Sequence, residues 1–239
     1  MKLGVISDIH GNFAALKTVI NELEKEKCDS IICLGDIVGY YSEINSCIEL
    51  IREKSVYCIK GNHDSYLIDR KKCPRSNSVN KCIDYQMGVI TKDNLQWLKE
   101  NLGEYIYRDN FFAVHGGWND YLDEYVKKFD FDSMREKYSN IKIFCSGHSH
   151  VQLKEEKYGI TYFNPGSVGQ PRDYDSRAAY AIIENYTVKL MRVKYNIDET
   201  CEAMKKAGFS EYFYENLYYG TKIGEKNEKG KDFICNTML

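Results

Sequence analysis

The five histidines of this 239-residue chain all lie in short blocks that combine glycine with acidic, amide or imidazole side chains. In chain order the blocks are Asp8-Ile9-His10-Gly11, Gly35-Asp36, Gly61-Asn62-His63-Asp64, His115-Gly116-Gly117 and Gly147-His148-Ser149-His150. Carboxylate, amide and imidazole groups are ligands that divalent transition metals accept. The blocks therefore predict an oxygen- and nitrogen-rich shell with enough ligands for two divalent metal ions.

The position of these blocks along the chain predicts that they meet. Each ligand block follows an apolar run that is typical of a β-strand, at residues 2–7, 30–34, 56–60, 111–115 and 141–145. Asp8, Asp36, Asn62, His115 and His148 consequently fall at the carboxyl ends of five strands. Open α/β sheets bind their ligands at that end, so we expect these side chains to converge on one rim.

Two blocks contain candidate ligands that are two residues apart, namely Asp8 with His10 and His148 with His150. Side chains at that spacing point to the same side of an extended backbone, so each pair could hold one metal ion. The adjoining glycines permit sharp turns and close backbone approach because they have no Cβ atom.

The elements that must position these side chains alternate at the start of the chain. Apolar residues recur at helical spacing over residues 12–25 and again over residues 42–52, where Ser42 is the predicted N-cap. With the strands between them, these helices predict a βαβαβ unit with a parallel sheet. Further helices are predicted at residues 78–87 and 92–101, followed by a strand pair at 105–108 and 111–115. Acidic, aromatic-rich helices are then expected through residue 138.

The second half of the chain predicts antiparallel pairing. Residues 151–156 and 160–164 form one predicted hairpin, and residues 179–184 and 187–193 form another. Together with the parallel unit, these hairpins predict an α/β fold of four layers, an αββα sandwich in which helices flank two mixed β-sheets. Helices are predicted at 198–207 and 210–218. We expect residues 1–219 to form one domain and the polar residues 220–239 to form a flexible C-terminal tail.

Composition narrows the class of protein. A formal net charge of −2 gives no bulk attraction to nucleic acid. No apolar run approaches the roughly 18 residues of a membrane span, and cleavage of a signal peptide would remove Asp8 and His10, so we expect a cytoplasmic protein. The nine cysteines lack any Cys-x-x-Cys pair, which favours reduced thiols, with Cys33, Cys58 and Cys145 on buried strands.

The five blocks together resemble the signature of the calcineurin-like metallophosphoesterases, in order, over residues 8 to 150. The four-layer sandwich is also the fold of that family. The resemblance implies that Asp8, His10, Asp36 and His150 hold one metal ion. It implies that Asp36, Asn62, His115 and His148 hold the other. Asp36 would then bridge both ions, because a carboxylate has two oxygen atoms.

The resemblance also implies a reaction in which a metal-bridging hydroxide attacks phosphorus in line with the leaving oxygen. The mixed ligand set suits manganese, which we expect, and also iron, cobalt, nickel or zinc. His63 is the candidate catalytic residue, since a protonated ring beside Asn62 could donate a proton to the leaving oxygen; alternatively it only binds phosphate. Asp64 either orients His63 or caps the following helix, and the cap is favoured.

One departure from the family pattern concerns the substrate. Protein Ser/Thr phosphatases have an aspartate and an arginine after the Gly-Asp block, where this chain has Gly39 and Tyr40. The chain instead resembles the small prokaryotic phosphodiesterase-type branch. Arg172, in the loop that follows Gly169, is a candidate to bind the substrate phosphate. Tyr40, Tyr41 and Tyr174 are candidates for stacking on a nucleobase.

These features favour an enzyme that hydrolyses phosphodiester or nucleotide phosphoanhydride bonds in a small phosphorylated or nucleotide substrate. The alternatives are a protein or small-molecule phosphomonoesterase and a non-catalytic scaffold that retains the fold. A scaffold would be expected to lose ligands or His63, and all of them are present. The sequence leaves the oligomeric state open.

Overall fold

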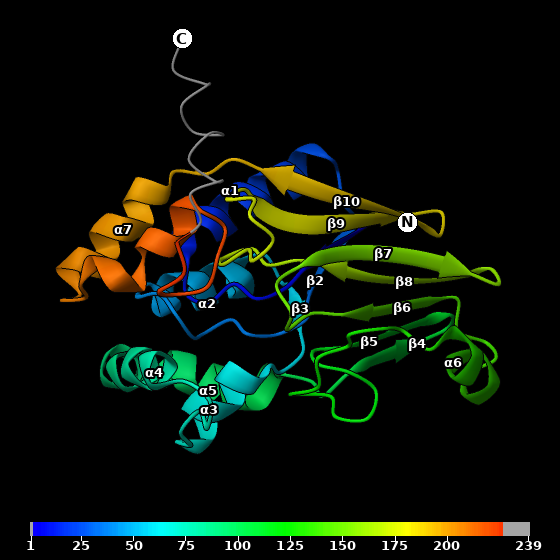
Figure 1. The fold of residues 1–239 in the computed structure, drawn as a ribbon, viewed down its shortest axis with the longest axis horizontal. Coiled ribbons are helices and arrows are strands. Elements are labelled where there is room, and N and C mark those ends of the chain that lie inside the picture. The colour runs from blue at the N-terminus through cyan, green and yellow to red at the C-terminus, as the bar shows by residue number, and fades with distance from the viewer. Residues whose placement is uncertain (1, 227–239) are drawn as a thin grey trace, which may run out of the picture.

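Two five-stranded β-sheets lie face to face in the computed structural model, which describes residues 2–226 (Figure 1). The first sheet has the strand order β10-β9-β1-β2-β3, with bounds β1 Lys2–Ile6, β2 Ser30–Cys33, β3 Tyr57–Cys58, β9 Ala178–Glu184 and β10 Thr187–Val193. The second has the order β4-β5-β6-β8-β7, with bounds β4 Ile106–Arg108, β5 Phe111–Val114, β6 Ile143–Ser146, β7 Gln152–Lys157 and β8 Ile160–Pro165.

The predicted parallel unit is confirmed. Strands β1, β2 and β3 pair in parallel, and the helices α1 (Phe13–Lys25) and α2 (Ile44–Glu53) connect them. The Asn12 side chain caps α1 by accepting a hydrogen bond from the Ala15 backbone N–H. The N-cap predicted at Ser42 is wrong, because α2 begins after Glu43 and has no side-chain cap.

The predicted hairpins are antiparallel, which makes both sheets mixed. The β9–β10 hairpin joins the first sheet beside β1, and β7 pairs with β8 at the edge of the second sheet. In the second sheet β5, β6 and β8 are parallel, while β4 and β7 form antiparallel edges. The carboxyl ends of the parallel strands in each sheet are thus available to form one rim.

Three apolar cores separate the four layers. Alternating strand residues divide between them: in β6, Phe144 contributes to the outer core, whereas Ile143 and Cys145 contribute to the core between the sheets. On the other side, α1 and α2 pack on the first sheet through residues such as Leu16 and Ile48. The predicted four-layer sandwich is confirmed, with α6 (Phe131–Lys137) as the only helix within residues 116–138.

The further helices predicted between residues 116 and 130 are wrong. The acidic side chains there cap turns instead of lying on helices. The Glu124 carboxylate accepts hydrogen bonds from the backbone N–H groups of Asn119 and Asp120, and Asp120 accepts from those of Leu122 and Asp123. Such local side-chain hydrogen bonds compete with helix formation.

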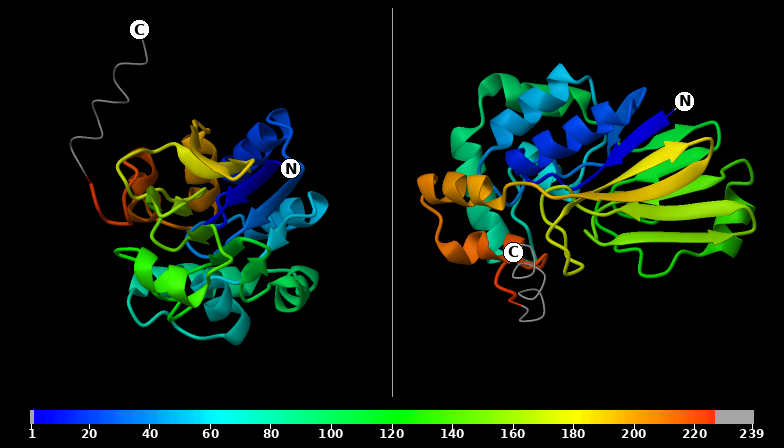
Figure 2. Two further views of the ribbon diagram at one scale, coloured as in Figure 1. Left: turned by 90° about the vertical axis from the view of Figure 1, so that its right-hand side faces the viewer. Right: turned by 90° about the horizontal axis from the view of Figure 1, so that it is seen from above.

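The remaining helices are α3 (Asn62–Asp69), α4 (Asn77–Val89), α5 (Lys92–Asn101) and α7 (Ile197–Lys206). They gather at one end of the sheets, the end toward which β1 runs, whereas α6 lies at the other (Figures 1 and 2). The helix predicted at residues 210–218 is instead two short 3₁₀ turns, Glu211–Phe213 and Glu215–Tyr218. Phe213 and Leu217 of these turns pack with Met204 of α7.

The first residues of the predicted tail pack against the domain. Thr221 is buried, its carbonyl oxygen accepts a hydrogen bond from the Asn216 side chain, and the Gly220 carbonyl accepts one from the Tyr174 backbone N–H. Residues 227–239 lie outside the described residues, so the domain boundary at residue 219 and the flexible tail stay predictions.

The cysteines within residues 2–226 are free thiols. Cys33, Cys58 and Cys145 are buried on β2, β3 and β6, as predicted. Between residues 2 and 226 there is no helix with the length and apolar character needed to cross a membrane.

Candidate metal centre

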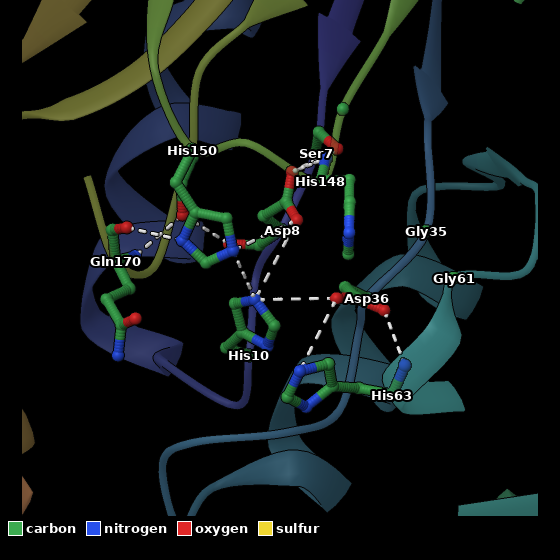
Figure 3. A network of polar contacts seen from close by, with 12 residues as sticks. Ser7, Asp8, His10, Gly35, Asp36, Gly61, His63, His148, His150 and Gln170 are labelled. Atoms are coloured by element: carbon green, nitrogen blue, oxygen red, sulfur yellow. Dashed lines mark hydrogen bonds and ion pairs between the residues drawn. The ribbon is translucent and has the colours of Figure 1, made fainter. Parts of the chain in front are cut away.

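Six of the predicted site residues meet where the strand ends of both sheets converge. Two groups of side chains have potential ligand atoms within 4.8 Å of one another: Asp8, His10, Asp36 and His150 form the first group, and Asp36, His115 and His148 form the second. All of these side chains are buried, and Figure 3 shows how several of them face one another. The predicted convergence of the blocks is confirmed.

Asp8 has one oxygen fixed by hydrogen bonds and one left free. Its Oδ2 atom accepts hydrogen bonds from the Ser7 hydroxyl, at 2.6 Å, and from the His148 backbone N–H, at 3.1 Å. Its Oδ1 atom lies 3.3 Å from His150 Nε2 and 3.8 Å from His10 Nε2 and makes no hydrogen bond within residues 2–226. The carboxylate is therefore held in place with an oxygen directed at the first group.

Three imidazoles are oriented in the same way by backbone carbonyl groups. The Nδ1 atoms of His10, His115 and His150 lie 3.0, 2.7 and 2.6 Å from carbonyl oxygens, which can only accept hydrogen bonds. Nδ1 must therefore donate, and in a neutral ring the Nε2 lone pair is left free to bind a metal ion. The Nε2 atoms of His10 and His150 are 3.0 Å apart, which shows that both rings face the same point.

Asp36 is shared by the two groups. Its Oδ1 atom accepts a hydrogen bond from the His63 backbone N–H at 2.8 Å. Its Oδ2 atom lies 3.6 Å from His10 Nε2 in the first group and 3.5 Å from His115 Nε2 in the second. This oxygen is buried and makes no hydrogen bond in the described chain. Its placement between the groups suits a bridging carboxylate.

Asn62 adds an amide oxygen to the second group. It is the first residue of α3, and its Oδ1 atom lies 3.1 Å from His115 Nε2. His148 contributes an Nε2 atom that is buried and has no hydrogen-bond partner in residues 2–226. The second group thus contains the four side chains that the resemblance implies.

The charges of the site depend on its burial. Burial by itself raises the pKa of Asp8 and Asp36, but the neighbouring imidazoles hold both pKa values well below their usual range. Burial also acts to lower the pKa of His115, yet the Asp36 carboxylate beside it raises that pKa to about 10. Burial lowers the pKa of His148 to about 3. Two ionised carboxylates therefore lie among imidazoles, most of which are neutral.

This arrangement fits divalent cations. Buried polar atoms are normally hydrogen-bonded, whereas Asp8 Oδ1, Asp36 Oδ2 and His148 Nε2 are buried and have no such partner within residues 2–226. All three atoms are potential metal ligands. A bound cation would satisfy them and would offset the two buried negative charges.

The backbone conformation at the ligands differs from the extended one expected. Asp8 and His10 both have φ near 55°, and His148 and His150 both have φ near 63°. These residues lie in tight left-handed turns, a conformation that costs non-glycine residues energy and is concentrated at functional sites. Moreover, His148 and His150 belong to different groups. The expectation that this pair holds one metal ion is wrong.

His63 lies beside the groups without belonging to either. Its ring is buried, its Nε2 atom is 4.0 Å from Asp36 Oδ2, and its Nδ1 atom has no hydrogen-bond partner in the described residues. Gly39, with φ of 141°, makes this approach possible, since a Cβ atom there would lie 2.8 Å from His63 Nδ1 and 2.3 Å from His10 Nδ1. Burial lowers the pKa of His63 to about 4.

Asp64 caps α3, as favoured by the sequence, and it also fixes the Asp36 loop. Its Oδ2 atom accepts hydrogen bonds from the backbone N–H groups of Gly61 and Asp36, and its Oδ1 atom accepts from those of Ile37 and Val38. No hydrogen bond in the described chain joins it to His63. Asp64 therefore positions Asp36, which both groups share, and not the candidate catalytic ring.

Arg172 reaches the site through Tyr40 and Gln170. Its guanidinium donates a hydrogen bond to the Tyr40 hydroxyl at 2.8 Å and two to the Gln170 side-chain oxygen. The Tyr40 ring in turn lies 4.5 Å from the His10 ring and 4.9 Å from the His63 ring, between ring centroids. Tyr40 and Arg172 both line a cavity of about 330 Å³ together with Asp36, Asn62, His63, His148 and His150.

The structure limits the tyrosines that could stack on a nucleobase. Tyr41 is only 1% exposed, and its hydroxyl accepts hydrogen bonds from Gln170 and Asn216. Tyr174 is 61% exposed and lies outside the lining of this cavity. The prediction of a stacking role is therefore wrong for Tyr41 and stays a prediction for Tyr174, whereas Tyr40 lines the cavity.

Two buried glutamines were not predicted to support the site. Gln86 on α4 accepts a hydrogen bond from the Gly39 N–H and donates to the carbonyl groups of Gly39 and Tyr41. Gln170 binds Arg172 through its side chain and His150 through its carbonyl oxygen. Gln86 lies 22 residues after the end of the nearest ligand block, so no local signal identifies it.

Comparisons with known proteins agree with this site. Residues 1–187 match the model of the calcineurin-like phosphoesterase superfamily domain. An uncharacterized protein of Methanocaldococcus jannaschii is 32% identical over 237 residues, which cover 91% of this chain and 98% of the relative. A serine/threonine-protein phosphatase of Salmonella typhimurium is 27% identical over 73 residues, which cover 30% of this chain and 34% of the relative.

Solved structures show the same fold. A metallophosphoesterase from Sphaerobacter thermophilus superimposes with a TM-score of 0.77 at 30% identity, covering 92% of this chain and 99% of that chain. A hypothetical protein from Pyrococcus horikoshii has a TM-score of 0.81 at 21% identity with the same coverage of both chains. With the family match over most of its length, and with its buried cluster of aspartates and histidines, this chain belongs to the calcineurin-like phosphoesterase superfamily and is a metallophosphoesterase, a hydrolase of phosphate esters.

Proposed function

We propose that this enzyme uses two divalent metal ions to hydrolyse phosphodiester or nucleotide phosphoanhydride bonds. Manganese is the metal that we expect at both positions. The observation that carries the proposal is the shared position of Asp36 Oδ2, which lies 3.6 Å from His10 Nε2 and 3.5 Å from His115 Nε2 and makes no hydrogen bond within residues 2–226. A carboxylate oxygen between two sets of ligands suits a dinuclear site better than a single ion.

The proposed ligand sets follow the two groups. One ion would be held by Asp8, His10, Asp36 and His150, and the other by Asp36, Asn62, His115 and His148. When bound, a pair of such ions supplies an activated water near neutral pH and stabilises charge on the phosphoryl oxygens. The nitrogen and oxygen donors suit manganese, iron, cobalt, nickel or zinc.

The chain's own residues would bind the phosphate and assist the departure of the leaving group. Arg172 lines the cavity with its guanidinium held by Tyr40 and Gln170, and no carboxylate within residues 2–226 forms an ion pair with it. It is therefore free to bind a phosphate oxygen. His63 lines the same cavity with an unpartnered Nδ1 atom. Burial keeps its ring neutral near pH 7, but the negative charge of a bound phosphate would raise its pKa, and we assign the protonated ring proton donation to the leaving oxygen.

The dimensions and residues of the cavity favour a small substrate. Its volume of about 330 Å³ is at the lower end of the range of about 300–1,000 Å³ that is typical of small-molecule sites. Gly39 and Tyr40 stand where protein phosphatases have an aspartate and an arginine. The 73-residue match to a protein phosphatase keeps monoester hydrolysis as the second candidate.

The test is hydrolysis of bis-p-nitrophenyl phosphate and of p-nitrophenyl phosphate, each with Mn²⁺ and with chelator. We expect metal-dependent cleavage that favours the diester and is abolished in Asp36→Asn. Asp84→Asn, which changes an exposed aspartate on α4, is the matched control and should retain activity. Preference for the monoester would support the second candidate. Absence of turnover with each of manganese, iron, cobalt, nickel and zinc would overturn the proposal in favour of a non-catalytic scaffold.

A further inference from the structure

Part of the cavity lining comes from residues outside the ligand blocks. Arg75, Ser76 and Ser78 contribute from the start of α4, and Tyr212 and Lys222 contribute from the C-terminal segment. Ser76 caps α4 by accepting a hydrogen bond from the Val79 N–H. These residues have hydroxyl and cationic groups, and none of them is needed to hold a metal ion.

This part of the lining is positively charged. Within the whole lining the cations are Arg75, Arg172 and Lys222, and the only carboxylate is that of Asp36, which belongs to the metal groups. Arg75 forms a two-point ion pair with Asp123. Lys222 is exposed, and no carboxylate within residues 2–226 forms an ion pair with it. Lys222 is therefore a cation in the cavity whose charge no described side chain balances.

The backbone that presents Lys222 is anchored on both sides. The Thr221 side chain before it is buried, and the Thr221 carbonyl accepts a hydrogen bond from Asn216. The Asn216 side chain also donates to the Tyr41 hydroxyl inside the domain. After it, the Glu225 N–H donates to the Lys222 carbonyl at 3.0 Å. The backbone of Lys222 is thus held beside the cavity, and its exposed side chain lies at the cavity lining.

We propose that Lys222 and Arg75 form a subsite for a second, non-scissile phosphate of the substrate. This rests on the proposed function and specifies its substrate class, namely nucleotides with one phosphate at the metal centre and another beside Lys222. A phosphate has several acceptor oxygens, which suits two cations, the hydroxyls of Ser78 and Tyr212, and the positive end of the 13-residue helix α4. A neutral or singly charged substrate would leave these groups unused.

The kinetic test compares two substrates that differ by a single phosphate: thymidine 5′-(p-nitrophenyl phosphate) and the same compound with a 3′-phosphate. We expect the Mn²⁺-loaded enzyme to have the lower KM for the second compound. In Lys222→Gln the ratio of the two KM values should fall about fivefold. The reason is that a charge-assisted hydrogen bond to the 3′-phosphate is lost at a partly solvated site. Lys222→Arg, which keeps the positive charge, should retain most of the wild-type preference for the substrate with the 3′-phosphate.

The matched control is Lys226→Gln, which removes the same charge four residues later. Lys226 pairs with Glu215 and does not line the cavity, so this variant should keep the wild-type preference. An equal loss of preference in Lys222→Gln and Lys226→Gln would indicate a general effect of surface charge and would overturn the subsite.

A binding measurement does not depend on turnover. Isothermal titration calorimetry of the chelator-treated protein with thymidine 3′,5′-bisphosphate and with thymidine 5′-phosphate should show tighter binding of the bisphosphate, and Lys222→Gln should remove the difference. If neither substrate is cleaved but this difference is observed, the proposed reaction fails and the anion subsite stands. If both substrates are cleaved and Lys222→Gln alters neither KM nor binding, the subsite fails and the proposed reaction stands.

Discussion

At the scale of single residues, the two oxygens of Asp36 have separate tasks. Oδ1 is fixed by the His63 backbone N–H, while Oδ2 lies between the two groups of ligands. The same division is found in Asp8, where Ser7 and the His148 backbone fix one oxygen and leave the other free. Each carboxylate is oriented by neutral donors that do not compete for a cation. This preorganisation reduces the cost of ordering the ligands when a metal ion binds.

The sequence left two roles open for His63, namely proton donation to the leaving oxygen and phosphate binding alone. A substitution of His63 distinguishes them. We expect His63→Asn to lower kcat about 10²-fold with an unchanged metal content, because the ring is not a ligand and proton donation contributes on this order. A proton donor matters most when the leaving group is basic. The loss should therefore be larger for a dinucleoside monophosphate, with an alkoxide leaving group, than for bis-p-nitrophenyl phosphate. Equal losses for the two substrates would assign His63 to phosphate binding alone.

Arg172 is expected to affect binding more than folding. We expect Arg172→Ala to raise KM about tenfold, since a charge-assisted hydrogen bond to phosphate is lost. Its partners Tyr40 and Gln170 both line the cavity, where water can replace the lost hydrogen bonds. The free energy of unfolding, measured with urea, should therefore change by less than about 1 kcal/mol. Arg177→Ala, which breaks an exposed ion pair with Asp175, is the control and should leave KM unchanged.

At the scale of elements, the site depends on tight turns after the strands. The turn after β3 and the turn after β2 touch, so that a Cβ atom on Gly61 would lie 2.1 Å from Asp36 Oδ1 and 2.4 Å from Asp36 N. Asp64, at the start of α3, joins the same two turns by accepting hydrogen bonds from both backbones. The Asp36 carboxylate is thus positioned by contact between two loops, and not by its own strand alone.

A glycine substitution tests this contact. Gly61→Ala should displace Asp36, lower the free energy of unfolding by about 2 kcal/mol, and weaken Mn²⁺ binding. Gly88→Ala in α4 is the matched control, because a Cβ atom there would have no neighbour within 4 Å. It should raise the free energy of unfolding by about 0.5 kcal/mol. Urea denaturation and calorimetric titration with Mn²⁺ measure both effects, and unchanged Mn²⁺ affinity in Gly61→Ala would contradict the argument.

At the scale of the whole molecule, each metal group takes ligands from both sheets. Asp8 and Asp36 follow β1 and β2 of the first sheet, whereas His115 and His148 follow β5 and β6 of the second. His150, after β6, joins the first group across the interface. Metal ions at these positions would link the two halves of the sandwich, which otherwise meet through apolar side chains such as Val5, Ala181 and Phe163.

Metal binding should therefore stabilise the entire fold. At a Mn²⁺ concentration 100 times the dissociation constant, we expect each occupied site to add about 2.7 kcal/mol to the free energy of unfolding. Differential scanning calorimetry with Mn²⁺ and with chelator would measure the gain as a rise in Tm. Asp36→Asn, which weakens both groups at once, should lose most of this rise. A Tm that is independent of Mn²⁺ would contradict a site shared by both sheets.

The sequence by itself determined the family of this protein, its candidate metal ligands and most of its elements. The ligand blocks are local, since each one follows an apolar strand pattern within a few residues, and so Asp8, Asp36, Asn62, His115 and His148 could be assigned to strand ends and to one rim. The parallel unit and the hairpins could also be predicted, because their strand, helix and turn patterns each lie within a short stretch of sequence. The prediction of helices in residues 116–138 failed because acidic side chains there bind turn backbones, which composition alone does not reveal.

Only the tertiary structure decided which ligands share a group and what surrounds them. His148 and His150 are two residues apart but face different groups, because left-handed turns replace the extended backbone. Gln86 and Lys222 reach the site from a helix and a segment that are distant in the sequence. Such contacts arise when two sheets pack and bring separate loops together, and no local periodicity encodes them. The sequence therefore specifies the ligands, whereas the packing of the sheets specifies the cavity and its charge.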